Sequence, residues 1–212
     1  MNKPKVRGLY AISPDLSDTG DLLDKTQQVL AGGARLIQYR NKSASGALRR
    51  EQAGLLLQLC REYQIPLIIN DHIELAAALD ADGVHVGRCD ISISEARRQL
   101  GQDKIVGASC YNNLNLAFWA EESGADYVAF GAFFPSLTKT DTVPVSTQLI
   151  DQAKQKITVP VVGIGGIRLT NAATVIQSGC DAIAVCNDLF ATKNVEARAK
   201  QYARLFTVHQ TI

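Results

Sequence analysis

Two cations and an amide occupy alternate positions in one short segment of the chain. Gln38, Arg40 and Lys42 stand at the end of an apolar run. Alternate residues of an extended strand point to the same side, so these three side chains would converge. Guanidinium and ammonium groups bind phosphate and pyrophosphate through charge-assisted hydrogen bonds. The segment therefore predicts an anion site. The alternative is a solvated loop with one inward arginine in a structural ion pair.

Two aspartates follow two later apolar runs. Asp71 comes directly after Asn70 at the end of the run 66–70, and Asp90 follows the run 83–87. If these runs are neighbouring parallel strands, both carboxylates lie at one edge, beside the cations. One or two carboxylates together with phosphate oxygens are common ligands of Mg²⁺. We therefore predict a magnesium site. The alternatives are that Asp71 caps the next helix and that Asp90 is a turn residue.

Hydroxyl groups and a lysine interleave in the segment 135–147. Ser136, Thr138 and Lys139 would deliver hydroxyl donors and a cation to a leaving anion if this segment closes over a site. An ordinary loop is the alternative. Ser109, at the end of the fifth apolar run, carries a hydroxyl that can hold a phosphate or an amide. No Asp/His pair in the sequence accompanies it, so we expect no nucleophilic triad.

The last two apolar runs end in small residues. Gly165 and Gly166 follow the seventh run, and Cys186 and Asn187 follow the eighth. In many barrels the loops after strands seven and eight bind phosphate through backbone N–H groups. The alternative is a tight turn that needs glycine for its backbone alone.

The histidines and cysteines indicate no separate site. His85 lies in the middle of the fourth run, where a core histidine with both nitrogens bonded is favoured over a catalytic one. Cys110 is expected to be a half-buried thiol rather than an activated nucleophile. Five cysteines without a C-x-x-C pair predict neither a zinc site nor a disulfide framework. This pattern favours a reduced, cytoplasmic protein.

Eight short apolar runs alternate with amphipathic segments along the chain. The runs typical of strands are 6–13, 36–40, 66–70, 83–87, 104–109, 127–132, 159–165 and 182–186. The segments typical of helices are 21–31, 47–63, 73–79, 94–100, 114–122, 147–157, 171–177 and 195–208. A pattern of glycine, small residue and Asp or Arg precedes several runs, at 33–35, 124–126 and 179–181.

This order predicts an α/β fold with one (β/α)8 TIM barrel domain spanning 1–212, and an open doubly wound sheet is the alternative. In a barrel, the residues that follow the apolar runs would lie at the carboxyl ends of the strands, where barrel chemistry is found.

Composition limits the class of partner. The chain has 22 Lys plus Arg and 21 Asp plus Glu, which gives a net charge of +1. Without a basic excess or a basic run, a nucleic-acid or anionic-membrane partner is disfavoured. No apolar run approaches the roughly 18 residues that a membrane helix needs. We expect phosphorylated small molecules as partners, and the sequence leaves a homo-oligomer open.

Taken in order, the strand-end segments resemble the thiamine-phosphate synthase (thiamine-phosphate pyrophosphorylase) family. The matching segments run through nearly the whole chain and are 9–12, 38–42, 69–71, 83–90, 107–109, 135–139 and 163–167. The resemblance implies a TIM-barrel transferase that uses Mg²⁺. Such an enzyme joins hydroxymethylpyrimidine pyrophosphate to hydroxyethylthiazole phosphate, or its carboxylated form, and gives thiamine phosphate and pyrophosphate.

The resemblance also implies roles for individual residues. Those that would bind the pyrimidine pyrophosphate are Gln38, Tyr39, Arg40, Asn41, Lys42, Asn70, Ser109 and Lys139. Those that would bind the thiazole phosphate are Ser136, Leu137, Thr138, Gly166, Cys186 and Asn187. The residues with catalytic roles would be Arg40, Lys42, Ser109 and Lys139, and the Mg²⁺ ligands would be Asp71 and Asp90. Because the thiazole nitrogen attacks, no protein nucleophile is required.

The chain departs from the family pattern at a few positions. Ser136 stands where Thr is common, Asn187 where Ser is common, and Arg88 and Cys89 where Gln and Glu are common. The rival functions are an isomerase like the aminothiazole tautomerase and a non-catalytic thiazole-phosphate or thiamine-phosphate binding protein. Neither rival needs both the cations and the aspartate pair, so the sequence favours the synthase.

Overall fold

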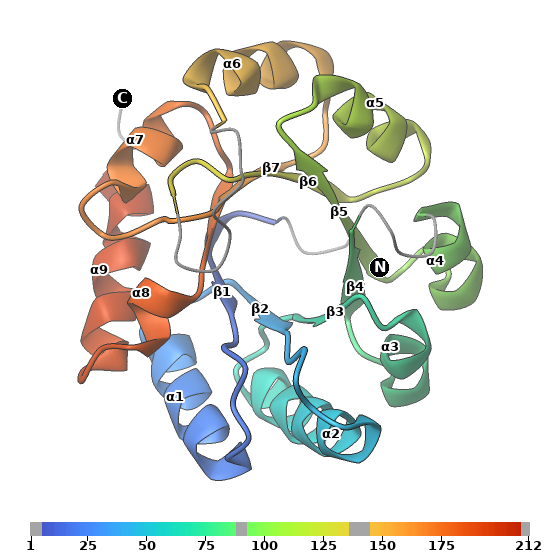
Figure 1. Cartoon of the computed structure of the whole chain (residues 1–212), viewed down its shortest axis with the longest axis vertical. Helices are drawn as coiled ribbons and strands as arrows, with labels where there is room; N and C mark the ends of the chain where they lie inside the picture. Colours follow the sequence, from blue (N-terminus) through green and yellow to red (C-terminus); the bar gives the residue numbers. More distant parts are fainter. Residues whose placement is uncertain (1–5, 88–92, 136–144, 209–212) are drawn as a thin grey trace.

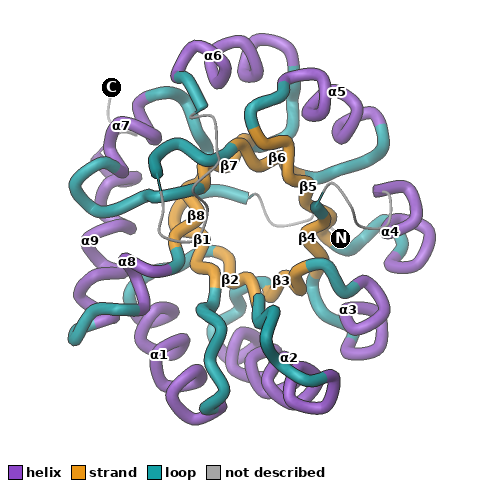
Figure 2. Tube along the Cα trace, viewed as in Figure 1, coloured by secondary structure: helices purple, strands orange, loops and turns teal. Residues whose placement is uncertain are grey.

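Eight parallel strands close into a barrel in the computed structural model, which describes residues 6–87, 93–135 and 145–208 (Figures 1 and 2). The strands are β1 (Gly8–Ile12), β2 (Leu36–Tyr39), β3 (Leu67–Asn70), β4 (Gly83–Val86), β5 (Ile105–Tyr111), β6 (Tyr127–Phe130), β7 (Val161–Ile164) and β8 (Ala182–Val185). The first strand pairs with the last, with Tyr10 opposite Ala184. The predicted TIM barrel is confirmed, and the alternative of an open sheet is wrong.

Helices surround this barrel (Figure 2). They are α1 (Thr19–Ala31), α2 (Gly46–Glu62), α3 (Ile73–Leu79), α4 (Ile93–Leu100), α5 (Leu114–Glu122), α6 (Thr147–Lys156), α7 (Ala172–Gln177), α8 (Asn187–Phe190) and α9 (Val195–Val208). The eight predicted helices are confirmed within a few residues at their ends. The sequence missed α8, because four residues are too few to show a helical period. None of the described helices is both long and apolar enough to cross a membrane.

Local signals in the sequence start and stop these helices. The Ser45 hydroxyl accepts a hydrogen bond from the Leu48 N–H at the start of α2, at 3.2 Å. Ser146 does the same at the start of α6. These caps satisfy N–H groups that have no partner within the helix. Gly124 and Gly179 follow helices at φ of 92° and 96°, a backbone region that favours glycine.

Apolar side chains pack in two layers, one inside the barrel and one between the strands and the helices. The alternation of strand residues produces both layers. Tyr10, Ile68 and Tyr127 fill the interior. Gly107 on β5 makes this possible, because a Cβ there would lie 2.0 Å from the Tyr127 ring. The glycine therefore provides the space for the largest side chain of the inner layer.

Three aspartates organise the amino-terminal end of the barrel. Asp82, Asp126 and Asp181 directly precede β4, β6 and β8. Each carboxylate accepts a backbone N–H at the start of the preceding strand. The distances are 2.8 Å to Leu67 N, 2.7 Å to Val106 N and 2.7 Å to Val161 N. The aspartates that end the repeated pattern at 124–126 and 179–181, together with Asp82, thus join neighbouring strands.

Candidate active site

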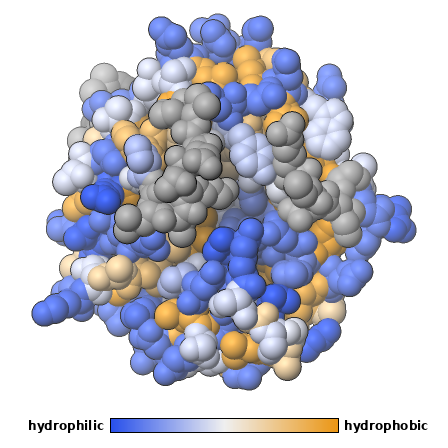
Figure 3. Space-filling view, viewed as in Figure 1, coloured by the Kyte–Doolittle hydropathy of each residue, from blue (hydrophilic) through white to orange (hydrophobic). Residues whose placement is uncertain are grey.

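A pocket lies at the carboxyl ends of β2 and β3 and in the loops that follow them. Its lining residues are Tyr39, Arg40, Asn41, Lys42, Arg49, Asn70, Asp71 and His72. Hydrophilic side chains gather on this face of the molecule near the barrel axis (Figure 3). The fold therefore brings together two segments, 39–42 and 70–72, that are separate in the sequence.

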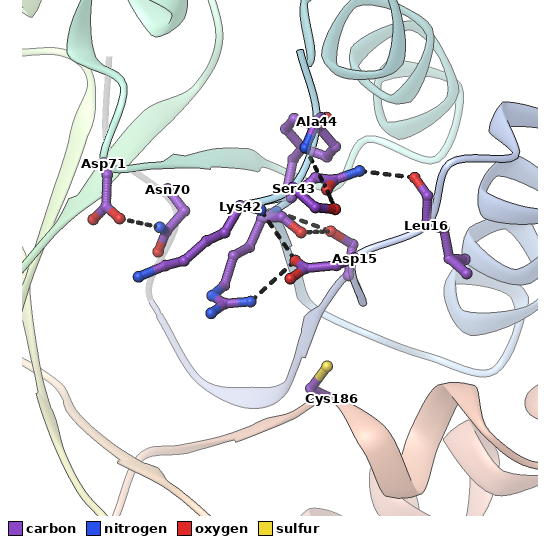
Figure 4. A network of polar contacts seen from close by, with 12 residues as sticks. Asp15, Leu16, Lys42, Ser43, Ala44, Asn70, Asp71 and Cys186 are labelled. Atoms are coloured by element: carbon purple, nitrogen blue, oxygen red, sulfur yellow. Dashed lines mark hydrogen bonds and ion pairs between the residues drawn. The ribbon is translucent and has the colours of Figure 1, made fainter. Parts of the chain in front are cut away.

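Asp15, in the loop after β1, accepts hydrogen bonds from the segment 40–42, called here the cationic segment. Its Oδ1 accepts hydrogen bonds from Arg40 Nη1 and from the Lys42 backbone N–H, both at 3.1 Å (Figure 4). Ser13 Oγ accepts from Arg40 N at 2.8 Å and donates to Arg40 O at 3.0 Å. The Lys42 ammonium group has no hydrogen-bond or ion-pair partner within the described ranges. It is available to an anion in the pocket.

Strand alternation does not bring Gln38, Arg40 and Lys42 together. β2 ends at Tyr39, so strand alternation does not reach Lys42, and that part of the prediction is wrong. Gln38 is still in the strand and points into the barrel, where its Nε2 donates to Tyr10 Oη at 2.7 Å. Asp15 positions the two cations instead. The sequence reasoning missed it, because a carboxylate 25 residues from Arg40 follows no local pattern.

Tyr39 and Asn41 direct their side chains toward α2. Tyr39 Oη donates to Gln52 Oε1 at 2.9 Å, and burial raises the pKa of Tyr39 to about 12. Asn41 Nδ2 donates to the Leu16 carbonyl at 2.7 Å, and Asn41 Oδ1 accepts the Ala44 N–H at 3.1 Å. Both side chains stabilise the loop. A ligand in the pocket would therefore meet the backbone of these two residues.

Asp71 turns its carboxylate toward the pocket. Asn70 Nδ2 donates to Asp71 Oδ2 at 2.6 Å (Figure 4). Asp71 has φ of 64°, in the left-handed region, and its N–H donates to the His85 carbonyl at 2.9 Å. The N-cap of α3 is His72, whose side chain makes no capping bond, so the alternative that Asp71 caps this helix is wrong. A left-handed aspartate costs on the order of 1 kcal/mol or more and is typical of functional sites.

Ser109 lies on β5 beside a buried histidine. Its Oγ is 2.9 Å from His85 Nε2, and His85 Nδ1 is 2.9 Å from Tyr127 Oη. His85 is 7% exposed, so the prediction of a core histidine with both nitrogens bonded is confirmed. Cys110 is fully buried, and burial raises its pKa to about 12. The prediction of a half-buried thiol is therefore wrong about the extent of burial, and the raised pKa disfavours the reactive thiolate.

The glycine pair after β7 meets the loop after β6. Gly165 and Gly166 have φ of 100° and 62°. A Cβ on Gly166 would lie 2.5 Å from the Phe134 carbonyl oxygen, so the backbone requires glycine here. Asn171, which precedes α7, donates to the Gly166 carbonyl at 3.1 Å and makes no capping bond with the helix. The backbone of this turn therefore requires glycine, as the alternative to a phosphate-binding role stated.

Cys186 and Asn187 stand where β8 meets α8. Burial raises the pKa of Cys186 to about 11, and the charge of Arg40 opposes this shift. Figure 4 shows Cys186 across a space from Asp15. Asn187 is exposed and begins α8. Barrel closure thus brings the end of β8 close to the cationic segment.

Several predicted residues fall outside the described ranges. They are the metal candidate Asp90 with its neighbours Arg88 and Cys89, and the loop residues Ser136, Leu137, Thr138 and Lys139.

Arg49 is a pocket cation that the sequence did not identify. It lies in the first turn of α2, and its Nη2 donates to the Ala44 carbonyl at 2.8 Å. Its Nε is buried and has no hydrogen-bond partner in the described part of the chain. On the helix pattern Arg49 belongs to the polar side, which is typical of a solvated residue. Only its place among the residues that line the pocket distinguishes it.

Comparison with known proteins identifies the family. A family model described as thiamine monophosphate synthase matches residues 9–189. The chain belongs to this family. The resemblance seen in the strand-end segments is confirmed.

Individual relatives of the thiamine monophosphate synthase family match over nearly the full chain. Thiamine-phosphate synthase of Nitrosospira multiformis is 54% identical over 202 residues, which is 95% of this chain and 86% of the relative. The enzyme of the same name from Methylobacillus flagellatus is 55% identical over 203 residues, or 96% and 97%. The solved thiamine phosphate pyrophosphorylase of Pyrococcus furiosus superposes with a TM-score of 0.85 at 33% identity, over 95% of this chain and 96% of that one.

Proposed function

We propose that the protein joins hydroxymethylpyrimidine pyrophosphate to hydroxyethylthiazole phosphate, or its carboxylated form, and releases thiamine phosphate and pyrophosphate. One observation carries the proposal: Arg40, Lys42, Asn70 and Asp71 line a single pocket at the carboxyl end of the barrel. Relatives named thiamine-phosphate synthase at 54% and 55% identity supply the reaction class.

The cations of the pocket would bind the pyrophosphate leaving group. Lys42 brings an ammonium group without a protein partner in the described ranges, and Arg40 keeps donors beyond its one bond to Asp15. Hydrogen bonds to charged groups contribute about 1.5–3 kcal/mol each. Their effect is larger when the charge grows during the reaction, as it does on a departing pyrophosphate. Lys139 would add a further cation.

The carboxylate of Asp71 fits a magnesium ion. It is an oxygen ligand of the kind that Mg²⁺ prefers, and it faces a pocket whose cations suit a phosphate. Among the described residues, no three His, Cys, Asp or Glu side chains lie together so that they could hold a metal ion. This fits a metal that takes most ligands from phosphate and water. We propose that Asp71 and Asp90 hold Mg²⁺. When bound, the ion would neutralise negative charge on the leaving pyrophosphate.

The reaction then needs binding and orientation rather than a protein nucleophile. The bond between the pyrimidine methylene and the pyrophosphate oxygen breaks, and its electron pair leaves with the pyrophosphate. The thiazole nitrogen donates its lone pair to the methylene carbon and forms the new C–N bond. Gln38, Asn70 and Ser109 would orient the pyrimidine substrate. The high pKa of Cys110 agrees with the absence of a thiol step.

The second substrate would bind between the loops after β6, β7 and β8. Gly166 and the backbone of Cys186 and Asn187 would hold the thiazole phosphate, together with Ser136, Leu137 and Thr138. The position of Cys186 near Arg40 supports a short distance between the two substrates. Holding both reactants in one orientation supplies much of the acceleration in such reactions.

Free thiols bear on where the protein works. Cys60, Cys110, Cys180 and Cys186 form no disulfide. We propose a cytoplasmic location, because reduced cysteines are the rule in that compartment.

An activity assay tests the proposal. The purified protein, with both substrates and Mg²⁺, should release thiamine phosphate and pyrophosphate in equal amounts. Lys42→Ala should lower kcat/KM for the pyrimidine substrate about 100-fold. Lys200→Ala removes an exposed lysine on α9 and should leave kcat/KM unchanged. Substrate binding without product would overturn the proposal and favour a binding protein. Turnover of an aminothiazole alone would favour an isomerase.

A further inference from the structure

A chain of hydrogen bonds runs through the barrel interior from Gln38 to Ser109. Gln38 Nε2 donates to Tyr10 Oη at 2.7 Å, and Tyr10 Oη is 2.8 Å from Tyr127 Oη. Tyr127 Oη is 2.9 Å from His85 Nδ1, and His85 Nε2 is 2.9 Å from Ser109 Oγ. Five strands contribute one residue each, and both ends of the chain belong to the proposed pyrimidine site.

The hydrogen-bonded groups between Gln38 and Ser109 are buried in the barrel. Tyr10 and Tyr127 are fully buried, and burial raises the pKa of both phenols well above the ordinary value. The two hydroxyls therefore stay protonated. The His85 ring stacks on Tyr127, with ring centroids 5.5 Å apart and 22° between the planes. A buried hydroxyl without a partner lowers the stability of the fold, so each proton in the hydrogen-bond chain needs an acceptor.

Counting protons gives the chain one direction. A phenol donates one hydrogen bond. Because Gln38 donates to Tyr10, the Tyr10 proton finds its acceptor only in Tyr127, and the Tyr127 proton then goes to His85 Nδ1. A neutral imidazole must carry its proton on the other nitrogen, Nε2, which donates to Ser109 Oγ. In the opposite direction the Tyr10 proton would have no acceptor among the described residues.

We infer that Tyr127 is a positioning residue that fixes the Nε2–H tautomer of His85 and thereby makes the Ser109 hydroxyl a hydrogen-bond donor to the pyrimidine substrate. Since His85 occupies the acceptor side of Ser109, the hydroxyl proton is directed elsewhere. This inference rests on the proposed function for the role of Ser109. The direction of the hydrogen bonds does not depend on the proposed function.

Nitrogen NMR of the histidine side chains tests the direction of the chain. In the wild-type protein at a pH where His85 is neutral, its Nε2 should be protonated and its Nδ1 should accept a hydrogen bond. The His85→Gln variant assigns the signal. Tyr127→Phe should move the Nδ1 signal toward that of a nitrogen with no donor. A wild-type Nδ1–H tautomer overturns the inference.

Gln38→Glu provides a second variant of nearly the same shape. A carboxylate can only accept, so the Tyr10 proton would turn toward position 38 and every later bond would reverse. His85 should then switch to the Nδ1–H tautomer. Retention of the Nε2–H tautomer in this variant would overturn the directed chain, even if Tyr127→Phe fails to fold.

Kinetics test the consequence for the substrate. Tyr127→Phe should lower kcat/KM for the pyrimidine pyrophosphate about tenfold and leave KM for the thiazole phosphate unchanged. Tyr202→Phe is the control. It removes another buried hydroxyl, which donates to Asp188 at 2.6 Å, and should alter neither the His85 spectrum nor the pyrimidine KM. Equal effects on both substrates contradict the inference. A wild-type protein without synthase activity would instead overturn the proposed function.

Discussion

Charged side chains stand at both ends of the barrel, with different partners at each end. At the amino-terminal end, Asp126 accepts the Val106 N–H and forms an ion pair with Arg97, which is 8% exposed. Asp181 accepts the Val161 N–H and pairs with Lys154 at 2.8 Å. These groups satisfy one another within the chain.

The carboxyl end leaves donors for a ligand. Lys42 Nζ and Arg49 Nε have no hydrogen-bond partner in the ranges that the structure describes. Arg40 forms an ion pair with Asp15 through Nη1. One end of the barrel therefore uses its charges to stabilise the strands, and the other end presents its cations to the pocket. Substitutions at the two ends should therefore separate stability from activity.

The largest effect is expected from Asp71→Asn. Removing the charge of a metal ligand should lower kcat/KM about 100- to 1000-fold and raise the Mg²⁺ concentration needed for half-maximal activity. The side chain is only partly buried, so the melting temperature should change little. Kinetics over a Mg²⁺ series and a thermal melt measure both. A loss of stability comparable to the loss of activity would mean that Asp71 is structural.

The same change at the opposite end, Asp126→Asn, should affect stability instead. It leaves the nearly buried Arg97 without its carboxylate, which costs about 3 kcal/mol. For a chain of this size, that shift is roughly 10 °C in Tm. Below the melting temperature kcat should stay within about twofold of wild type. A fall in kcat with unchanged Tm would break the comparison between the two ends.

Alkaline pH should lower the free energy of unfolding, because thiols are buried between the two ends of the molecule. Burial raises the pKa of Cys60, Cys110 and Cys180 to about 12 each, from an ordinary value of 9.0. The unfolded chain releases these protons first. Each thiol's contribution is therefore complete below pH 9 and is lost as the pH rises toward 12, by up to about 1.4 kcal/mol per pH unit. Denaturant melts at pH 8 and pH 10 measure the loss.

The thiols themselves provide the control for this pH effect. Replacing all three by alanine should lower stability at pH 8 but make the decline toward pH 10 shallower. An unchanged slope would show that other groups cause the alkaline loss.

The smallest effect is expected from Arg49→Met, which keeps the apolar stem and removes the charge. KM for the pyrimidine pyrophosphate should rise about tenfold, as for one lost charge-assisted hydrogen bond. Arg50→Met is the matched control, because Arg50 is exposed on the same helix. If both variants behave alike, Arg49 contributes only to the general field of the pocket. Steady-state kinetics at fixed ionic strength distinguish the two outcomes.

Much of the site could be located from the sequence, since strand ends carry the chemistry in this fold. The sequence predicts that the segment 38–42 meets Asn70 and Asp71, and residues 39–42 do line one pocket with them, whereas Gln38 points into the barrel. Two assumptions failed, because they extended a local rule beyond its element. Alternation ends with β2 at Tyr39, and with Asp71 in the left-handed region the N-cap of α3 is His72 rather than Asp71.

Local signals in the sequence suffice for the order of strands and helices and for the chemical identity of the strand ends. These signals act between residues a few positions apart, through alternation, caps and glycine conformation. The closure of β1 against β8, the hydrogen bond from Arg40 to Asp15, and the hydrogen bond between Tyr10 and Tyr127, 117 residues apart, depend instead on the assembled fold. Such contacts follow no local period. They exist because a closed barrel brings distant strands within hydrogen-bond distance and burial then requires their polar groups to pair.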